Sequence, residues 1–249
     1  MTKASDNRPQ VLMLADAARP QMKQRADELR PVIEKYFDVV ATVNDFSGDL
    51  PDEEVDFAVV LGGDGSILRA ARLMGFQQLP VVGVNLGRLG FLADLLPDVL
   101  DEVLPLVAQG QYRVVSHLMF ECKVTSGERE LEHWLGLNEV AVLAGPPFAM
   151  LEVELYVDGI LATTYSCDGL IVSTPVGSTA HNLSAGGPIL RKDLQAFVIS
   201  PISPHTLTNR PVVESANRTY ELAVPEPHEG TTLVIDGRVV RQLDSQDRI

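Results

Sequence analysis

The stretch VDFAVVLGGDGSILRAARLMG, residues 55–75, decides the fold class of this chain. The apolar run at 57–61 predicts a buried strand, and the glycine-rich residues that follow it predict a tight turn. Apolar residues then recur at helical spacing over 66–74, and Gly75 is placed to end that helix. A buried strand that turns sharply into a helix is typical of α/β domains with a parallel sheet.

The same alternation surrounds this stretch throughout the first part of the chain. Strands are predicted at 11–16, 38–43 and 80–84, and helices at 20–37 and 97–109. Short apolar strands separated by helices indicate strands that run parallel, with the helices packed on the sheet. We therefore expect an N-terminal α/β domain over residues 1–110, formed by a parallel sheet with flanking helices.

From residue 111 onward the pattern changes to strands. A long strand is predicted at 112–125, and residues 151–157 alternate apolar and polar side chains ahead of the turn pair Asp158-Gly159. A second strand–Asp-Gly–strand pattern covers 234–240, and further short strands are predicted at 170–173, 197–200, 219–224 and 231–235. We expect a β-rich C-terminal domain over residues 111–249.

The composition excludes several classes of protein. The chain has 249 residues, enough for one large or two small domains, and its 45% hydrophobic content is too high for a disordered protein. It carries 20 basic and 34 acidic side chains, a net charge of −14. A general nucleic-acid binder needs a basic surface, so no nucleic-acid partner is expected.

The cellular setting is predicted from apolar runs and cysteines. The apolar run at 11–15 is too short for the core of a signal peptide, and no later run reaches the length of a membrane span. Cys122 and Cys167 lack C-x-x-C spacing. We expect a cytoplasmic protein without membrane association, in which both cysteines are structural.

The glycine-rich turn is the strongest candidate for chemistry. Gly63 and Gly65 let a phosphate approach the backbone closely, and the start of the following helix supplies N–H groups for an anion. Asp64 between them can take a proton from a hydroxyl nucleophile or help to hold a metal ion. By itself GGDG is also compatible with a purely structural turn between strand and helix.

The familiar nucleotide and metal motifs are absent from the sequence. No Gly-Lys-Ser/Thr follows the glycines, as in a Walker A motif, and the third glycine of G-x-G-x-x-G is missing. There is no H-R-D loop of protein kinases, and the five histidines show no zinc-site spacing. We expect no protein metal site.

Three other polar segments can serve a ligand. Residues 168–188 offer hydroxyl groups, backbone N–H groups and a carboxylate for a nucleoside. Asn138-Glu139 places an amide beside a carboxylate, a pair that can read a sugar or a base. The loop at 85–92 presents Arg88 and Phe91 after a predicted strand, where open α/β sheets bind ligands.

With these segments taken together, the chain resembles the NAD kinase family. The similarity rests on GGDGS at 62–66, NLGRLGFL at 85–92, LNE at 137–139, DGLIVSTPVGSTAHNLSAGGPI at 168–189 and the late Asp236-Gly237. GGDG is shared with lipid kinases and phosphofructokinases. The long segment at 168–189, combined with Asn138-Glu139, is specific to the family.

The resemblance implies phosphoryl transfer from ATP, or in some members from inorganic polyphosphate, to the 2′-hydroxyl of the adenosine ribose of NAD, which gives NADP. It implies Mg²⁺ or another divalent cation across the donor phosphates, and a homodimer or homotetramer. Because the chain is acidic and its substrates are anions, binding is expected to need Mg²⁺, the helix start after Gly63, and cations such as Arg69 and Arg88.

The resemblance also assigns roles to residues of the first domain. Asp64 matches the base that takes the 2′-hydroxyl proton. Gly63 and Gly65 match the donor-phosphate loop, and Arg69 matches a phosphate-side contact. Phe91 matches an aromatic residue near the adenine.

In the second domain, Asn138 and Glu139 match a nucleotide-binding pair. Asp168 matches a carboxylate that binds the dinucleotide, and it is expected to reach a ligand partly bound by a neighbouring subunit. The segment expected to wrap the NAD consists of Thr179, Ala180, His181, Asn182, Leu183 and Ser184.

Four departures from the family pattern stand out. Val176 replaces a usual Thr and His181 a usual Tyr, a ring that can become charged near pH 6.5. Arg238 replaces a frequent Gln after the late Asp-Gly, where it either offsets negative charge or is simply exposed. Members usually continue well past this hairpin, whereas this chain ends at Ile249, so either this member is short or a last segment is missing.

Two alternatives to a NAD kinase remain open from the sequence. One is a kinase of another small hydroxyl compound, such as a lipid or a sugar phosphate, that uses the shared GGDG turn. The other is a catalytically weak NAD(P)-binding regulatory protein, suggested by His181 and the short C-terminus.

Overall fold

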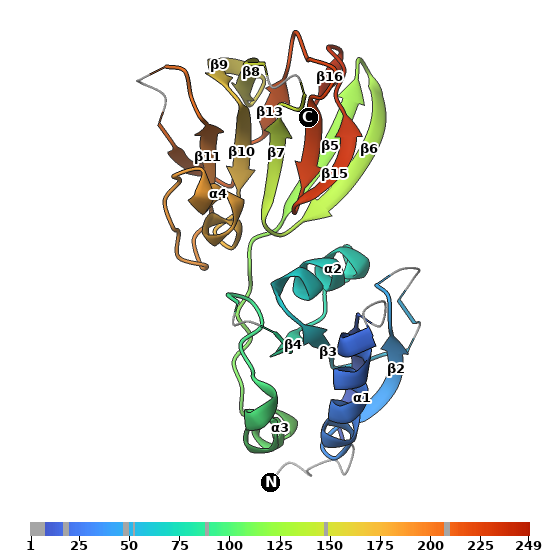
Figure 1. The fold of residues 1–249 in the computed structure, drawn as a ribbon. Coiled ribbons are helices and arrows are strands. Elements are labelled where there is room, and N and C mark those ends of the chain that lie inside the picture. The colour runs from blue at the N-terminus through green and yellow to red at the C-terminus, as the bar shows by residue number, and fades with distance from the viewer. Residues whose placement is uncertain are drawn as a thin grey trace. The chain divides into compact units, whose positions relative to one another are not determined.

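The structure is a computed structural model that describes residues 8–16, 20–46, 50–51, 53–87, 90–146, 149–206 and 210–249. The chain divides into two compact units, Met1–Val115 and Ser116–Ile249. Figure 1 labels the helices and strands of the two units.

The first unit has the predicted α/β architecture. Its elements are β1 (Gln10–Ala15), α1 (Pro20–Glu34), β2 (Asp38–Val43), β3 (Phe57–Gly62), α2 (Asp64–Met74), β4 (Val81–Asn85), a 3₁₀ turn (Pro97–Val99) and α3 (Leu100–Ala108). The four strands form one parallel sheet in the order β2-β1-β3-β4. The parallel sheet with flanking helices is therefore confirmed.

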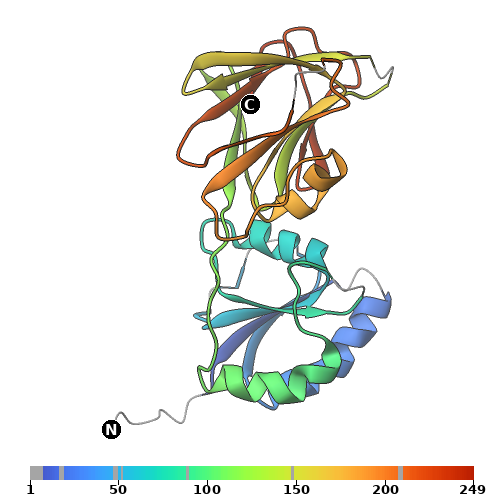
Figure 2. The same cartoon turned by 90° about the vertical axis from the view of Figure 1, so that its left-hand side faces the viewer.

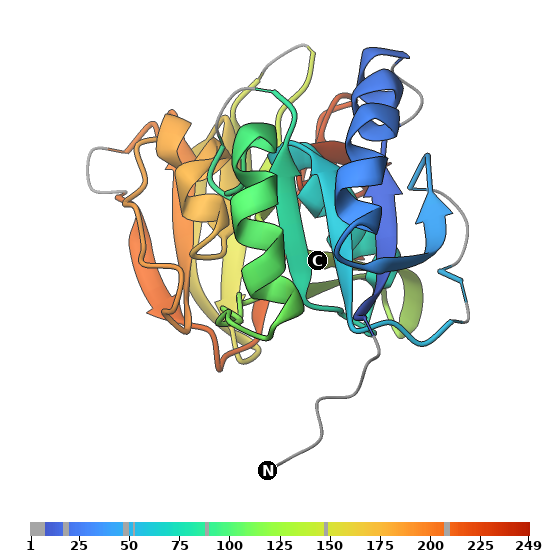
Figure 3. The ribbon, with the colours of Figure 1, turned by 90° about the horizontal axis from the view of Figure 1, so that it is seen from below.

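Helices cover both faces of this sheet, which explains why β3 is buried along its whole length. Figure 2 shows α1 and α3 on one side of the sheet and α2 on the other, and Figure 3 views the sheet from the α1 and α3 side. Alternate residues of β1, such as Met13, join the core under α1 and α3. Phe37 after α1 meets Phe57 of β3 edge to face, with 5.1 Å between ring centroids.

The strand order creates a topological switch point at the edge where β1 and β3 end. The connection from β1 leads to β2 on one side of β1, and the next connection, from β2, leads back past β1 to β3 on its other side. Open α/β sheets bind ligands at such a switch point, beyond the carboxyl ends of the strands. Asp16 follows β1 there and the glycine-rich turn follows β3.

One sequence-based prediction is wrong in this region. The strand predicted over 112–125 begins only at Phe120, and residues 111–119 form no strand or helix. The side chains at 111–116 are exposed and belong to no sheet. An apolar or β-branched run is not stabilised as a strand when no neighbouring strand pairs with it. This segment instead connects the two units.

The second unit consists of two six-stranded antiparallel sheets, in the orders β12-β11-β10-β7-β14-β15 and β6-β5-β16-β13-β8-β9. The strands of the first are β7 (Glu139–Leu143), β10 (Gly169–Ser173), β11 (Ala196–Ile202), β12 (Val212–Ser215), β14 (Thr232–Ile235) and β15 (Arg238–Gln242). Those of the second are β5 (Phe120–Ser126), β6 (Arg129–Gly136), β8 (Leu151–Val157), β9 (Ile160–Cys167), β13 (Tyr220–Ala223) and β16 (Asp247–Arg248). The β-rich C-terminal architecture is confirmed.

Side chains from both sheets share one core, which makes this unit a β-sandwich. Val140 and Val142 of β7 point into that core, whereas Ala141 joins Ile171 and Val234 on the opposite face of the sheet. Cys122 and Cys167 are free thiols in the core, and burial raises their pKa values to about 12 and about 11. Thiols held protonated in this way are chemically inert.

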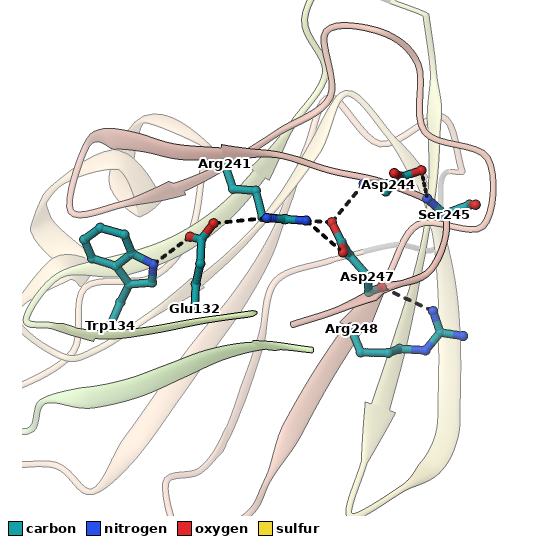
Figure 4. Close-up of polar contacts among 7 residues, drawn as sticks. All are labelled: Glu132, Trp134, Arg241, Asp244, Ser245, Asp247 and Arg248. Atoms are coloured by element: carbon teal, nitrogen blue, oxygen red, sulfur yellow. Dashed lines mark hydrogen bonds and ion pairs between the residues drawn. The ribbon is translucent and has the colours of Figure 1, made fainter. Parts of the chain in front are cut away.

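A partly buried ion-pair network fastens the short strand β16 (Figure 4). Asp247 is 2% exposed, and its carboxylate accepts hydrogen bonds from Arg241 Nε at 2.9 Å and from the backbone N–H of Asp244 at 3.0 Å. Arg241 Nη1 also donates to Glu132 Oε1 at 3.1 Å, and Trp134 Nε1 donates to the other oxygen of Glu132 at 3.0 Å. The buried carboxylate of Asp247 is therefore paired with a cation, as burial of a charge requires.

Among the described residues, no helix combines the length and the apolar character that crossing a membrane requires.

Candidate functional site

The glycine-rich turn joins β3 to α2 through a close approach that only glycine permits. A Cβ atom on Gly62 would lie 2.1 Å from Ser66 Oγ, far inside van der Waals contact. Gly63 caps the helix in an extended conformation, and its carbonyl accepts the N–H of Ser66 at 2.9 Å. The first N–H groups of the eleven-residue helix α2 have no carbonyl ahead of them in the helix, so this end can receive an anion.

Asp64, the first residue of α2, is half-buried, and its carboxylate holds the loop that follows β4. Its Oδ2 accepts the backbone N–H of Phe91 at 2.8 Å. Its Oδ1 accepts the N–H groups of Leu92 and Ala93 at 2.9 and 3.3 Å. The loop passes so close that a Cβ atom on Gly90 would lie 2.3 Å from Asp64 Oδ1. The turn and the loop are thus joined through this one side chain.

Phe91 and Arg69, two further predicted residues of the first unit, flank this arrangement. Phe91 is 55% exposed. Arg69 Nη2 lies 2.7 Å from Oδ2 of Asp16, and its guanidinium stacks over the Phe46 ring at 4.7 Å. Arg69 is therefore oriented by two neighbours, and Asp16 offsets part of its charge. Arg88 lies outside the described residues.

In the second unit, Asn138 and Glu139 are held at the start of β7 by hydrogen bonds on both sides of the main chain. The carboxylate of Asp236 accepts the backbone N–H groups of Leu137, Asn138 and Glu139, the shortest at 2.7 Å. On the other side, Thr174 Oγ1 donates to the Leu137 carbonyl at 2.6 Å, and the Thr174 N–H donates to the Asn138 carbonyl at 2.8 Å. The main chain is fixed, and the two side chains are presented from it.

Glu139 has unusual electrostatics for a carboxyl group. It is 3% exposed, and its Oε2 has no hydrogen-bond partner among the described residues. Burial and, to a smaller extent, the charge of Asp236 raise its pKa to about 7, against the opposing effect of a hydrogen bond with the backbone of Gly237. At neutral pH this group is therefore close to half protonated, and its protonated form can donate a hydrogen bond.

The predicted NAD-wrapping segment forms a 3₁₀ turn (Gly177–Thr179) and a short helix α4 (His181–Ser184) beside β10. Asn182 is fully buried, and both ends of its amide are hydrogen-bonded. Its Nδ2 donates to the carbonyls of Ser178 and Pro188, each at 3.1 Å, and its Oδ1 accepts Ser200 Oγ at 2.7 Å. In this geometry Asn182 holds the segment together.

The other members of this segment are more accessible. Leu183 and Ser184 are exposed, and Thr179, Ala180 and His181 are half-buried. Val176, which stands where the family usually has a threonine, is 3% exposed. Arg238 is exposed over the Trp134 ring at 5.8 Å, which fits the expectation of an exposed hairpin residue.

Asp168 lies away from Glu139 along the same pair of strands. The register pairs Glu139 with Ser173 and Leu143 with Gly169, so Asp168 and Glu139 stand at opposite ends of the β7–β10 ladder. Five strand residues span about 17 Å. Asp168 is half-exposed and its Oδ1 lies 3.5 Å from His205 Nε2. It is therefore not part of the Asn138–Glu139 cluster.

Two further features bear on ligands. A cavity of about 600 Å³ in the second unit is lined by apolar residues such as Phe120, Phe197 and Leu222, and by none of the predicted site residues. Within the described part of the chain, no three His, Cys, Asp or Glu side chains are grouped to hold a metal ion.

Comparison with known proteins identifies the family. The sequence profile of the ATP-NAD kinase N-terminal domain matches residues 7–112, and that of the ATP-NAD kinase C-terminal domain matches residues 137–249. The chain belongs to the NAD kinase family. It is 56% identical to a NAD kinase of Rhodopirellula baltica over 87% of this chain and 70% of that one. A NAD kinase of Geotalea daltonii is 41% identical over 81% of this chain and 70% of that one.

Solved structures of NAD kinases and their relatives share the fold. The NAD kinase from Archaeoglobus fulgidus in complex with ATP has a TM-score of 0.70 and 29% identity, covering 96% of this chain and 88% of that one. Yeast NADH kinase complexed with NADH has a TM-score of 0.78 at 21% identity, covering 98% and 80%.

Sequence reasoning did not foresee what several polar residues do in this NAD kinase fold. Asp236 was noted as part of a hairpin turn, but its hydrogen bonds reach residues about a hundred positions earlier in the chain. Ser200, the partner of Asn182, had no local signal, and Asp16, the partner of Arg69, had only a weak one. The position of Asp16 directly after a buried strand was the one hint available.

Proposed function

We propose that this NAD kinase transfers a phosphoryl group from ATP to the 2′-hydroxyl of the adenosine ribose of NAD, and that Asp64 is its base. The observation that carries this proposal is the position of Asp64, at the start of α2 and the carboxyl end of β3, where an anionic ligand is expected. The carboxylate is within one residue of the N–H groups that would receive the donor phosphates. A base and a phosphate cradle in one turn are what phosphoryl transfer to a hydroxyl requires.

The hydrogen bonds of Asp64 indicate which oxygen would act. Oδ1 accepts two backbone N–H groups, whereas Oδ2 accepts one. A carboxylate oxygen has two lone pairs in its plane, so Oδ2 retains the capacity to accept the 2′-hydroxyl proton. The N–H groups that hold Asp64 also keep it oriented, which reduces the entropy cost of reaching the reactive geometry.

A divalent cation, Mg²⁺ by preference, would neutralise charge on the donor phosphates when bound. Mg²⁺ is commonly held by one or two carboxylates together with substrate phosphates and water. No three His, Cys, Asp or Glu side chains are grouped as ligands among the described residues, and the remaining lone pair of Asp64 Oδ2 is assigned to the hydroxyl proton, so the ion would be held mainly by the donor phosphates and water. Gly63 and Gly65 would admit the phosphates, and Arg69 would add positive charge beside them.

The second unit would bind the acceptor. Asn138 and Glu139 offer an amide and a buried carboxyl group to the nucleotide. Thr179, Ala180 and His181, with Leu183 and Ser184, would line the dinucleotide, while Asn182 supports them from beneath. Phe91 of the first unit would stack on the adenine.

We also propose that the enzyme works in the cytoplasm as a homodimer or homotetramer. Asp168 stands about a strand's length from Glu139, which supports its use for a ligand shared with a neighbouring subunit. Light scattering of the purified protein tests the oligomer. An active monomer would contradict this part of the proposal.

The function is tested by a coupled assay of NADP formation with ATP and inorganic polyphosphate as parallel donors. We expect turnover with ATP and Mg²⁺, and its loss in excess chelator. A panel of lipids and sugars in place of NAD serves as the control. Phosphorylation of one of these but not of NAD, or tight NAD binding without turnover for either donor, would overturn the proposal.

A further inference from the structure

The Asp236-Gly237 turn contains a carboxylate that its own hairpin does not require. Asp236 and Gly237 connect β14 to β15 with φ values of 47° and 72°. Two successive residues with positive φ make the type of turn that Asn-Gly forms as readily as Asp-Gly. An amide would therefore serve the hairpin equally well, and the carboxylate must be explained by what lies outside it.

What lies outside it is the main chain of Leu137–Glu139. Asp236 Oδ1 accepts the N–H of Asn138 at 2.7 Å and that of Glu139 at 3.2 Å, and Oδ2 accepts the N–H of Leu137 at 3.0 Å. The Asp236 N–H donates back to the Glu139 carbonyl at 3.0 Å. Three consecutive N–H groups that converge on one site favour an anion.

These bonds matter because they act on the residues that would contact the nucleotide. Glu139 is 3% exposed and its Oε2 has no partner among the described residues, so its direction depends on its main chain, on packing and on a hydrogen bond with the backbone of Gly237 in the same turn. The Asn138 side chain, half-buried, has no hydrogen bond with another described residue. If the main chain of this pair rotates, both side chains change direction together.

We propose that Asp236 is a positioning residue, whose ionised carboxylate fixes the main chain of Leu137–Glu139 and thereby aims Asn138 and Glu139 at the bound NAD. This inference rests on the proposed function of the Asn138–Glu139 pair and extends it to a residue that does not itself touch the substrate. The closing experiment separates the two.

The chain contains a matched control for the test. Asp158-Gly159, between β8 and β9, is a second hairpin in the same unit, with φ values of 50° and 79°. The Asp158 carboxylate bonds to the Arg218 side chain and to the Thr219 N–H, away from any proposed ligand residue. Asp236→Asn and Asp158→Asn are thus the same substitution in the same kind of turn.

The first measurement is steady-state kinetics. Asp236→Asn places an NH₂ group where N–H donors now meet an acceptor, so we expect the KM for NAD to rise about tenfold or more. The KM for ATP should change much less, because the donor turn belongs to the first unit. Asp158→Asn should leave both constants unchanged. NAD kinetics of Asp236→Asn that match those of Asp158→Asn would overturn the proposal.

The second measurement does not depend on activity. Hydrogen exchange at the Leu137, Asn138 and Glu139 amides should accelerate about tenfold or more in Asp236→Asn and stay as in the wild type in Asp158→Asn. Unchanged protection in Asp236→Asn would overturn the positioning role, whether or not the wild-type protein makes NADP. A wild-type protein that makes no NADP would overturn only the proposed function. If Asp236→Asn does not fold, Asp236→Gly tolerates the positive φ, also removes the carboxylate and carries the same expectations.

Discussion

Asp64 in the first unit and Asp236 in the second make the same pattern of hydrogen bonds from different secondary-structure elements. Each carboxylate accepts the N–H groups of three consecutive residues, 91–93 for Asp64 and 137–139 for Asp236. Asp64 begins a helix at the end of a parallel strand, whereas Asp236 sits in a hairpin turn with positive φ.

The difference lies in what each carboxylate secures. The loop held by Asp64 presents Phe91, which is 55% exposed, whereas Asp236 holds Leu137 and Glu139, which are 5% and 3% exposed. Asp64 lies at a helix start that can receive phosphates, so it can both support its loop and take part in the reaction. Asp236 supports a buried main chain and acts only through its neighbours. The same hydrogen-bond pattern therefore does not define a residue's role; its surroundings do.

The strongest challenge to this comparison is Asp64→Asn. Loss of a general base costs about 10²–10⁴-fold in rate, so NADP formation should fall by that factor while circular dichroism stays unchanged. Asp94→Asn, an exposed carboxylate close to the same loop, is the control and should retain full activity. Near-normal turnover in Asp64→Asn would leave Asp64 with a supporting role only, like that of Asp236.

The second prediction concerns Glu139, on the Asp236 side. Its pKa rises from an ordinary 4.5 to about 7 on folding, so the native state keeps a proton that the unfolded chain releases. The stabilisation that comes from this retained proton is fully present below pH 4.5 and is lost as the pH rises through 7. Between pH 4.5 and 8, the free energy of unfolding of the wild type should therefore fall by about 3 kcal/mol because of Glu139, and this fall should be absent in Glu139→Gln.

Urea unfolding of the wild type and Glu139→Gln across this pH range measures the effect. Glu152→Gln, an exposed carboxylate on β8, is the control and should leave the pH dependence as it is in the wild type. Parallel curves for wild type and Glu139→Gln would mean that Glu139 is ionised throughout.

The third prediction tests the Asp64 side by its geometry. Gly90→Ala places a Cβ atom 2.3 Å from Asp64 Oδ1, so the carboxylate or the loop must move. We expect a loss of about 1–3 kcal/mol in the free energy of unfolding and reduced NADP formation. Gly110→Ala is the control. Gly110 has a φ of 74° and nothing within 4 Å of an added Cβ, so this substitution strains the backbone without creating a steric contact. Full activity in Gly90→Ala would show that the hydrogen bonds between the loop and Asp64 are not needed for activity.

The smallest expected effect is at Arg238, next to the Asp236 turn. Its stacking on Trp134 is exposed to solvent and is worth about 0.5–1 kcal/mol. Arg238→Gln, which introduces the residue frequent in the family, should lower the free energy of unfolding by no more than this and leave kinetics unchanged. A marked rise in the KM for NAD would instead assign Arg238 a role in offsetting the ligand's negative charge.

The sequence by itself determined the order and type of most elements, because local patterns decide them. The apolar run before Gly62 and the helical spacing after Gly63 required a strand, a turn and a helix, and the two Asp-Gly pairs required hairpins. The resemblance, carried by ordered motifs, pointed to the NAD kinase family that the comparisons confirm. The over-long strand before Phe120 failed because pairing partners, which no local pattern records, decide where a strand begins.

Only the tertiary structure decided which polar groups meet. It brought Asp236 to the Asn138 backbone, Asp16 to Arg69 and Ser200 to Asn182, and it separated Asp168 from Glu139 by the length of a strand. Two hairpins with the same Asp-Gly pair thus acquired different tasks, one beside a ligand segment and one beside Arg218. Hydrogen bonds of this kind join residues distant in sequence, and their geometry exists only after both sheets have paired in register.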